Sequence, residues 1–396
     1  MTPALVRLTA AKTVANTALR WIPPFLPTLE RAFGATTTQL TTVIGLGEAA
    51  GLSTIAVGRH LDRRRERLVM VGGLLAISAS ASIALIGTLG SFALSFAVLI
   101  VGVSNFTVAG HAWISHRVDY RWRARSIGLF ETSWALALLV GAPLIAILIS
   151  VVGWRGPFGA IAVASAAAAI LLVFRLPEES ETKGDDTAAP TPAENAGVEH
   201  AGTEQARSER MSMRAWFVIA GSSTMAMAGL SVFVVSGTWL HDSFGVSTGG
   251  LGMIAMTFGA VELAASTGTA AFADRLGKLR STLAGLVVLT IGLVIMLSAG
   301  DRLLVGVCGL LIFLLGFEFG FVTSLSLISE AGPTARGRTL SIAAAVGTVA
   351  RGSGTILSGW LYGIHGISGT AALSAAAATV ALVSFALSRR GAPVGT

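Results

Sequence analysis

Eight side chains that can carry a charge lie inside stretches of the sequence that are otherwise apolar. At the centre of a bilayer each such group costs at least about 2.5–3.5 kcal/mol, so it is expected to face a cavity or a partner of opposite charge. An acid beside a base forms an ion pair, whereas an acid without one can take up and release a proton. The eight are Lys12, Arg20, Glu48, His111, Glu131, Glu262, Glu318 and Arg351.

The depth of these residues along their segments suggests which of them meet. At about 1.5 Å per helical residue, Arg20 and Glu48 both come to the middle of a membrane. Glu318 and Arg351 are central as well. The depths therefore favour two mid-membrane ion pairs, one between Arg20 and Glu48 and one between Glu318 and Arg351.

Proton coupling needs an acid that is left without a base in at least one state. The candidates are Glu318 and Glu48, followed by Glu262, and a static ion pair is the alternative for each. His111 and Glu131 share one third of the membrane and form a further candidate pair. A hydrogen-bonded histidine that only contributes to packing is the alternative for His111.

The composition indicates the environment in which these groups work. The chain has 396 residues, a mean hydropathy of +0.74 and 12% charged residues, where soluble proteins have about 25%. One cysteine, Cys308, excludes a disulfide scaffold. The high isoelectric point could suggest nucleic acid, but the basic residues lie in short loops between apolar segments. The sequence therefore predicts an integral membrane protein whose partner is the lipid bilayer and not nucleic acid.

Twelve segments are long and apolar enough to cross a bilayer as helices. The first contains charged residues and three prolines, so an amphipathic helix at the interface is its alternative, and two close pairs of segments could be split differently. The segments are 8–29, 38–57, 68–89, 92–115, 126–152, 157–174, 214–240, 248–272, 282–299, 303–328, 339–362 and 370–387.

Basic residues in the loops predict the orientation of the chain. The even-numbered connections are rich in arginine, as in 59–67 and 117–125, whereas the odd-numbered connections hold only Arg31, Arg155 and Arg302. Because Lys and Arg accumulate on the cytoplasmic side, the even connections and both termini are expected in the cytoplasm. The expected location is the plasma (cytoplasmic) membrane, crossed many times.

The chain divides into two related parts. Residues 176–213 are acidic and proline-containing, which is typical of a disordered linker, and they separate predicted six-helix bundles at 1–175 and 214–396. Asp62-Arg63 follows the second span of the first part as Asp274-Arg275 follows that of the second. Parallel six-helix repeats of this kind are a known transporter design, with the substrate site between them.

The loop after each second span resembles a signature of the major facilitator superfamily, Gly-x-Leu-x-Asp-Arg-x-Gly-Arg-Arg. The first copy runs over 58–67 and the second over 270–280; Arg65 and Ala270 depart from it, each standing where the family has glycine. The resemblance covers the whole chain and implies an all-α fold of twelve membrane helices in two pseudo-symmetric bundles, working by alternating access. It also implies a cytoplasmic gate, unless the arginines only set topology; the gate residues would be Gly58, Asp62, Arg63, Asp274, Arg275, Gly277 and Lys278.

The fifth span resembles a signature of the proton-driven drug antiporters in that family. Its Gly141 and Pro143 match, whereas Ala137 replaces a glycine and the fourth span lacks the usual arginine. The resemblance implies proton-coupled efflux of a small organic or drug-like molecule. An uptake symporter or uniporter for a sugar or organic acid is the first alternative, and a membrane sensor or scaffold that transports nothing is the second.

In the facilitator fold, spans 1, 4, 7 and 10 line the cavity, which implies a wall of mainly aromatic side chains. No phosphate-binding loop, His-Glu-x-x-His or paired-cysteine motif occurs. We therefore expect no enzyme activity, cofactor or metal, and a monomer whose partners are a small-molecule substrate and protons. The wall candidates are Asn16, Trp21, Phe25, Trp113, Phe313 and Phe317.

Overall fold

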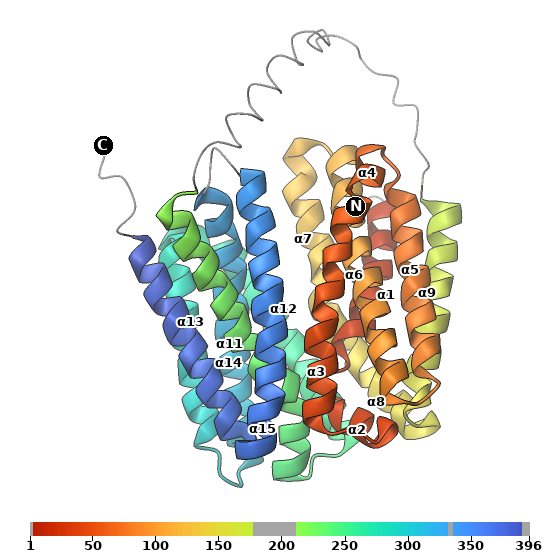
Figure 1. Cartoon of the computed structure of the whole chain (residues 1–396). Helices are drawn as coiled ribbons and strands as arrows, with labels where there is room; N and C mark the ends of the chain where they lie inside the picture. Colours follow the sequence, from red (N-terminus) through yellow and green to blue (C-terminus); the bar gives the residue numbers. More distant parts are fainter. Residues whose placement is uncertain (1–2, 177–210, 332–335, 390–396) are drawn as a thin grey trace.

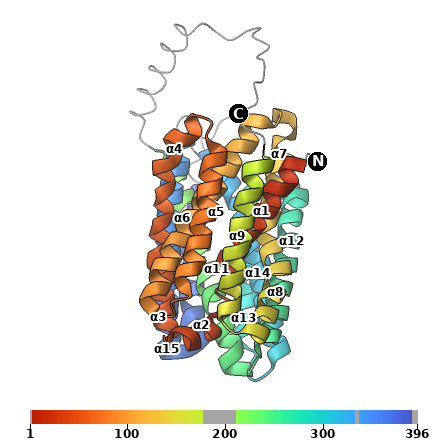
Figure 2. The ribbon, with the colours of Figure 1, turned by 90° about the vertical axis from the view of Figure 1, so that its right-hand side faces the viewer.

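The computed structural model describes residues 3–176, 211–331 and 336–389, and all regular secondary structure within these ranges is helical. The predicted linker therefore lies almost entirely outside the described residues. We refer to residues 3–176 as the N-terminal half and to the remainder as the C-terminal half. Figures 1 and 2 show their long helices lying side by side with roughly parallel axes.

Proline breaks the first helix of the N-terminal half. The predicted span 8–29 is in fact α1 (Pro3–Arg20), a turn over residues 21–25, and α2 (Leu26–Phe33). Pro23 and Pro24 have no N–H group to continue the helix, which accounts for the break. The other helices are α3 (Thr37–Gly47), η1 (Glu48–Ser53), α4 (Thr54–Asp62), α5 (Glu66–Ala84), α6 (Leu89–Arg117), α7 (Tyr120–Leu136), η2 (Ala137–Gly141), α8 (Ala142–Val152) and α9 (Arg155–Arg175).

The last helix of the C-terminal half folds back on itself. Gly366 has φ 60° and ψ −150° inside α15, and Thr370 Oγ1 donates to the carbonyl oxygen of Ser358 at 3.2 Å. A straight helix would separate residues 12 apart by about 18 Å, so the predicted spans 339–362 and 370–387 are two antiparallel arms. The helices are α11 (Met213–Phe244), α12 (Thr248–Leu276), α13 (Lys278–Leu297), α14 (Leu303–Ala331) and α15 (Arg336–Ser388).

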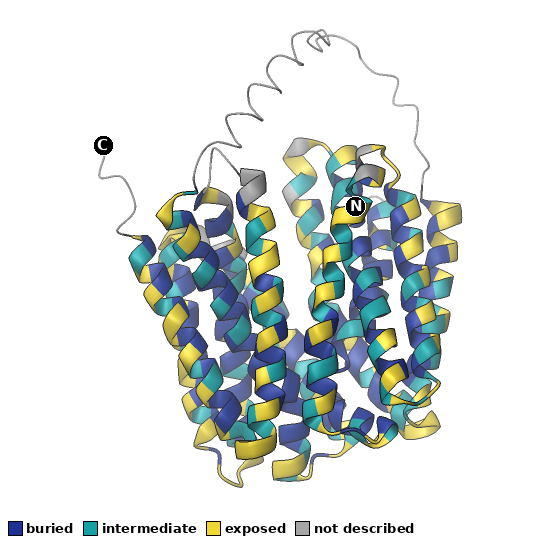
Figure 3. Ribbon diagram, in the orientation of Figure 1, coloured by how far each residue is buried: buried dark blue, intermediate teal, exposed yellow. Residues whose placement is uncertain are grey.

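Ten helices among the described residues are long and apolar enough to cross a membrane. The segment Thr339–Ser388 counts once among them although it has two arms, and α1 is not included. Exposed residues follow the outer faces of the helices, and buried ones face the interior (Figure 3). Many of the exposed side chains are large and apolar, as at Val151, Phe174 and Leu304. The chain is thus an all-helical protein that crosses the membrane many times.

The two halves contact each other at the end of the molecule opposite Pro3 and Arg389, here called the remote end. An added Cβ on Gly45 would lie 2.5 Å from the carbonyl oxygen of Gly352, so α3 and α15 touch by their backbones. Thr238 of α11 reaches across and donates to Glu30 Oε1 at 3.2 Å, and Thr37 donates to the same oxygen at 2.7 Å. These contacts close the remote end.

At the opposite end, called the termini end, the halves stand farther apart, because α15 and α3 diverge toward it in Figure 1. Ile55 on α4 is 80% exposed and Val349 on α15 is 71% exposed. Nearer the middle of the molecule, Arg20 and Glu48 make polar contacts across the boundary between the halves.

Gly45→Leu is expected to prevent the remote end from closing, because its side chain would overlap Gly352. In a Cys308→Ser background, labelling of Ala146→Cys by a membrane-impermeant maleimide should rise several-fold, since Ala146 is buried against Gly252 of the other half. Gly72→Leu is the matched control because an added Cβ there meets nothing within 4 Å. Equal labelling in both variants would contradict the expectation.

Candidate functional site

A buried ion pair joins the two halves near the middle of the molecule. Both terminal nitrogens of Arg20 on α1 lie 2.5 Å from the carboxylate oxygens of Glu262 on α12. The two side chains are 4% and 5% exposed. Arg20 also donates to the carbonyl oxygen of Trp134 at 2.9 Å, and its guanidinium lies 4.2 Å from the Trp134 ring centre. A bidentate contact of this kind fixes both the distance and the orientation of the partners.

A second carboxylate lies close to this pair. Glu318 of α14 is buried, accepts a hydrogen bond from Ser266 Oγ at 3.4 Å, and is subject to the charges of Glu262 and Arg20. We call Arg20, Glu262 and Glu318 the central charge cluster. Arg20 is ion-paired with Glu262, and Glu318 has only a hydrogen bond from Ser266. With both carboxyl groups ionised, the cluster would therefore need one additional positive charge to be neutral. A proton or a cationic substrate group can supply that charge.

Glu48 and Arg351 form the second ion pair between the halves. Arg351 Nε donates to Glu48 Oε2 at 3.2 Å and its terminal nitrogen donates to Thr348 at 3.2 Å. The predicted pairs of Arg20 with Glu48 and of Glu318 with Arg351 are therefore wrong. Depth along a helix does not tell which side of the helix a residue occupies. Arg20 lies on the face of α1 directed at α7 and α12.

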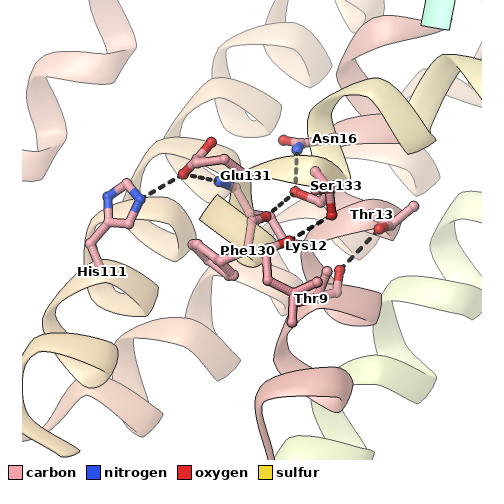
Figure 4. A network of polar contacts seen from close by, with 10 residues as sticks. Thr9, Lys12, Thr13, Asn16, His111, Phe130, Glu131 and Ser133 are labelled. Atoms are coloured by element: carbon pink, nitrogen blue, oxygen red, sulfur yellow. Dashed lines mark hydrogen bonds and ion pairs between the residues drawn. The ribbon is translucent and has the colours of Figure 1, made fainter. Parts of the chain in front are cut away.

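A third group of charges belongs to the N-terminal half alone (Figure 4). Lys12 of α1 is 2% exposed, and its ammonium lies 2.6 Å from Glu131 Oε1 and 4.1 Å from the Phe130 ring centre. His111 Nε2 of α6 lies 2.6 Å from that same oxygen. The predicted contact between His111 and Glu131 is thereby confirmed. Lys12 and His111 share one carboxylate oxygen, and Glu131 as a whole is 45% exposed.

Glu131→Gln is expected to destabilise the protein, because Lys12 would keep a buried positive charge without a counter-ion. The loss should be about 1–2 kcal/mol, less than for a fully enclosed pair because Glu131 is half exposed. Adding Lys12→Met removes the stranded charge and should restore most of the loss. Thermal unfolding in one detergent compares the three proteins, and a double variant no more stable than Glu131→Gln would disprove the coupling.

The predicted aromatic wall is mostly packed inside the halves. Trp21, Phe25, Trp113 and Phe313 are buried in the apolar core, and the Trp21 ring contacts Phe158 at 5.2 Å between centres. These rings are not confined to one end of the molecule, because Trp113 lies near the termini end, where the Arg117 guanidinium is 5.3 Å from its ring centre. Phe317 stacks on Phe321 at 5.4 Å, and Asn16 donates to Ser133 at 3.1 Å.

The aromatic rings that do contact the central charge cluster were missed. They are Trp134 of α7 and Phe233 of α11, whose ring centre lies 5.5 Å from the Arg20 guanidinium. Trp134 could have been found because it stands three residues after Glu131, nearly one helical turn away. Phe233 gives no such signal, since it lies in an apolar stretch without charged neighbours.

The helix-5 motif forms a local distortion beside α1. Residues Ala137–Gly141 are a π-helical turn, η2, and Pro143 begins the first turn of α8 after it. An added Cβ on Gly141 would lie 2.6 Å from Thr17, so α1 approaches the backbone closely here. Turns of this type are frequent at functional sites. The turn η2 begins three residues after Trp134.

The side chains of Asp62 and Asp274, predicted as gate residues, lie outside the described residues. Gly277 has φ 83°, a conformation that favours glycine, between α12 and α13. Lys278 forms an ion pair with Glu330 at the end of α14. Of the remaining gate residues, Gly58 lies in α4, Arg63 follows the end of α4, and Arg275 lies in the last turn of α12.

Glu66 is a buried acid at the termini end that sequence reasoning did not single out. It is 0% exposed at the start of α5 and pairs with His116 and, at 3.3 Å, with Arg117. Its signal was an acid within the basic run 59–67, which could have been matched to the basic end of α6. The contact joins α5 to α6 within the N-terminal half.

The donor set of the charged groups does not suggest a metal ion. In the parts of the chain that the structure describes, no three His, Cys, Asp or Glu side chains converge in a way that could hold one. The central charge cluster contains a guanidinium, which competes with a cation for the same carboxylates.

Comparisons with known proteins agree with this architecture. The chain is 25% identical over 377 residues to the uncharacterized MFS-type transporter YwfA of Bacillus subtilis (strain 168), covering 93% of this chain and 86% of YwfA. The crystal structure of a bacterial homologue of the human lysosomal transporter Spinster, inward-facing and unoccupied, has a TM-score of 0.75 at 16% identity, covering 98% of this chain and 94% of that one. A D-xylose-proton symporter has a TM-score of 0.76 at 14% identity, covering 98% and 97%.

A family model spans most of the chain and decides its membership. The model described as Major Facilitator Superfamily matches residues 8–335, which include nearly all of the N-terminal half, α11 to α14 of the C-terminal half and the central charge cluster. The chain belongs to the major facilitator superfamily, as a multi-pass membrane transporter.

Proposed function

We propose that this transporter is proton-coupled and exports a small organic molecule by antiport. The observation that carries the proposal is the central charge cluster, in which Arg20 pairs with Glu262 across the boundary of the halves while a second buried carboxyl, Glu318, lies within range of both charges. We further propose that the protein lies in the plasma membrane and crosses it twelve times. Both termini would then lie in the cytoplasm. The termini end then faces the cytoplasm.

The geometry supports a specific coupling step. Arg20 and Glu262 come from different halves, so opening of the remote end would pull them apart. Glu262 would then be a buried carboxylate without its base, and it would take up a proton from the side to which the site is open. When the halves return to the state described above, Arg20 displaces that proton, which leaves toward the termini end. One proton enters per cycle.

Glu318 supplies the second requirement of this scheme. It stays within the C-terminal half beside Ser266 and next to the ion pair, so a proton can pass between the two carboxylates. The half-exposed Glu131, with Lys12 and His111, is a charged group that a substrate entering from the termini end could meet. A substrate with an amine, hydroxyl or other hydrogen-bond donor could bind its carboxylate.

Transport in cells tests the proposal. Cells that lack their own efflux systems and make this protein should accumulate less ethidium than cells with an empty vector, and the difference should vanish when the proton gradient is collapsed. The inactive comparison is the same protein with Glu318→Gln. Accumulation equal to the empty vector would reject broad efflux of cations.

Uptake by symport is the second candidate, because the fourth span lacks the arginine that the drug antiporters carry. Proteoliposomes with an imposed pH gradient separate the two directions. Antiport gives substrate movement opposite to the proton, symport gives movement with it, and a sensor or scaffold gives neither. Sugars and organic acids are the substrates to test in the symport direction.

A further inference from the structure

A cavity of about 720 Å³ opens at the termini end of the C-terminal half, where α12, α13, α14 and α15 end or begin. We call it the C-terminal basic pocket. Four basic side chains and one carboxylate line it. Lys278 is paired with the carboxylate, Glu330, whereas no ion pair to any described residue is formed by the other three. These are Arg275, Arg280 and Arg389.

At the corresponding corner of the N-terminal half, a hydrogen bond joins two helix ends. There α5 begins at Glu66 and α9 ends at Arg175, as α13 begins at Lys278 and α15 ends at Ser388 in the C-terminal half. Arg67 donates to the carbonyl oxygen of Leu176 at 3.2 Å and thereby ties the two helix ends together. Arg280 lies at the corresponding corner, one residue beyond the position that the offset of 212 residues between Glu66 and Lys278 assigns to Arg67, and it makes no such bond to a described residue.

Comparison of the two corners therefore distinguishes two roles for the arginines in these loops, namely orientation of the chain in the membrane and binding of a ligand. Orientation in the membrane requires only their charge and their side, and both corners fulfil that requirement. The C-terminal corner also has a cavity lined by three guanidinium groups that form no ion pair with a described residue. Arginines around a cavity can bind an anion, and a guanidinium fits phosphate through two parallel hydrogen bonds.

The position of the pocket indicates which anion reaches it. It lies at the ends of α13 and of the second arm of α15, which packs beside α13 and forms one edge of the molecule in Figure 1. Both helices carry exposed apolar side chains along their length, such as Val287, Val294 and Val383. These surfaces are in the hydrocarbon, so the pocket lies at the depth of the lipid phosphates.

Two further features fit a lipid. Leu279 and Leu327 line the pocket next to its charges, so apolar and charged surfaces adjoin as they do in a phospholipid. Gly277 precedes the first turn of α13 without a capping side chain, which adds the positive end of a helix to the same corner. Basic pockets between membrane helices bind anionic lipid headgroups.

We propose that the C-terminal basic pocket binds the headgroup of an anionic phospholipid, and that a headgroup with two phosphates binds best because three guanidinium groups are available. The lipid joins the ends of α12, α13 and α15 as the bond from Arg67 to Leu176 joins helix ends in the N-terminal half. This site is separate from the central charge cluster and does not depend on which substrate is transported.

The experiment uses the full-length protein, purified in a neutral detergent and stripped of lipid. Cardiolipin should raise its Tm by roughly 3–6 °C, phosphatidylglycerol by less, and phosphatidylcholine not at all. Native mass spectrometry should count one retained cardiolipin. In the double variant Arg280→Gln/Arg389→Gln, the affinity for cardiolipin should fall at least tenfold. The double variant Arg280→Lys/Arg389→Lys keeps both positive charges and should retain most of the affinity.

Arg64→Gln/Arg65→Gln is the matched control, because it removes two exposed arginines from the N-terminal half. It should bind cardiolipin like the parent protein. An equal loss in this control would reduce the effect to general surface charge and overturn the proposal. Unchanged affinity in the Gln variant would overturn it too, and so would a Tm rise with pyrophosphate as large as that with cardiolipin, which would assign the pocket to a soluble phosphate.

Discussion

Glu318→Gln is expected to abolish accumulation driven by a proton gradient. A gradient of one pH unit stores about 1.36 kcal/mol per proton, which supports roughly a tenfold concentration ratio of a neutral substrate. Glutamine keeps the size of the side chain and its bond to Ser266 but cannot carry an exchangeable proton. The ratio in proteoliposomes should fall to about one.

Exchange without a gradient distinguishes loss of coupling from loss of folding. Counterflow of labelled for unlabelled substrate should persist in Glu318→Gln, because the substrate can still bind and the halves can still move. Thr323→Ser on the same helix is a control that changes a buried polar side chain without removing an acid. A variant that still concentrates substrate tenfold would exclude Glu318 as the coupling acid.

Arg20→Gln is expected to be among the most destabilising single changes in the chain. It would leave Glu262 buried without its base, beside a second carboxylate, and removing one partner of a buried pair costs about 3–5 kcal/mol. Arg20→Gln/Glu262→Gln leaves no stranded charge at that pair and should recover most of the loss. Thermal unfolding in detergent gives the comparison.

The second inter-half pair provides the control for this result. Arg351 and Glu48 are 32% and 21% exposed, so solvent screens them and Arg351→Gln should cost less than about 1 kcal/mol. Transport by Arg20→Gln/Glu262→Gln should remain uncoupled even though the protein is stable again. If the double variant unfolds as early as Arg20→Gln, or still concentrates substrate, the pair does not have the proposed role.

The fold could be predicted to a large extent because lipid imposes a simple requirement. Any span must be long, apolar and helical, and the hydropathy of the sequence records this directly. What it did not record was the break at Pro23 and Pro24, whose effect on the first span was underestimated. The reversal of α15 at Gly366, in contrast, falls in the gap between the predicted spans 339–362 and 370–387.

The charged residues of the site could be predicted, but their partners could be predicted only in part. His111 and Glu131 were matched correctly because they lie in consecutive spans at a similar depth. Arg20 and Glu262 were not matched, because their contact depends on how α1 and α12 are rotated. Rotation is determined by packing of the two halves, including backbone contacts such as Gly45 with Gly352, which no pattern in a single sequence reveals.

The carboxyl group of Glu30 gives the closed remote end a dependence on pH. Burial raises its pKa, and the hydrogen bonds from Thr37 and Thr238 only partly oppose that shift. A raised pKa in this state means that the contact is most stable when the carboxyl is protonated, and that this stability is lost as the pH rises through the raised value. A rise in pH through that value on the side of the remote end should therefore loosen the contact, through a proton distinct from the one carried through the centre.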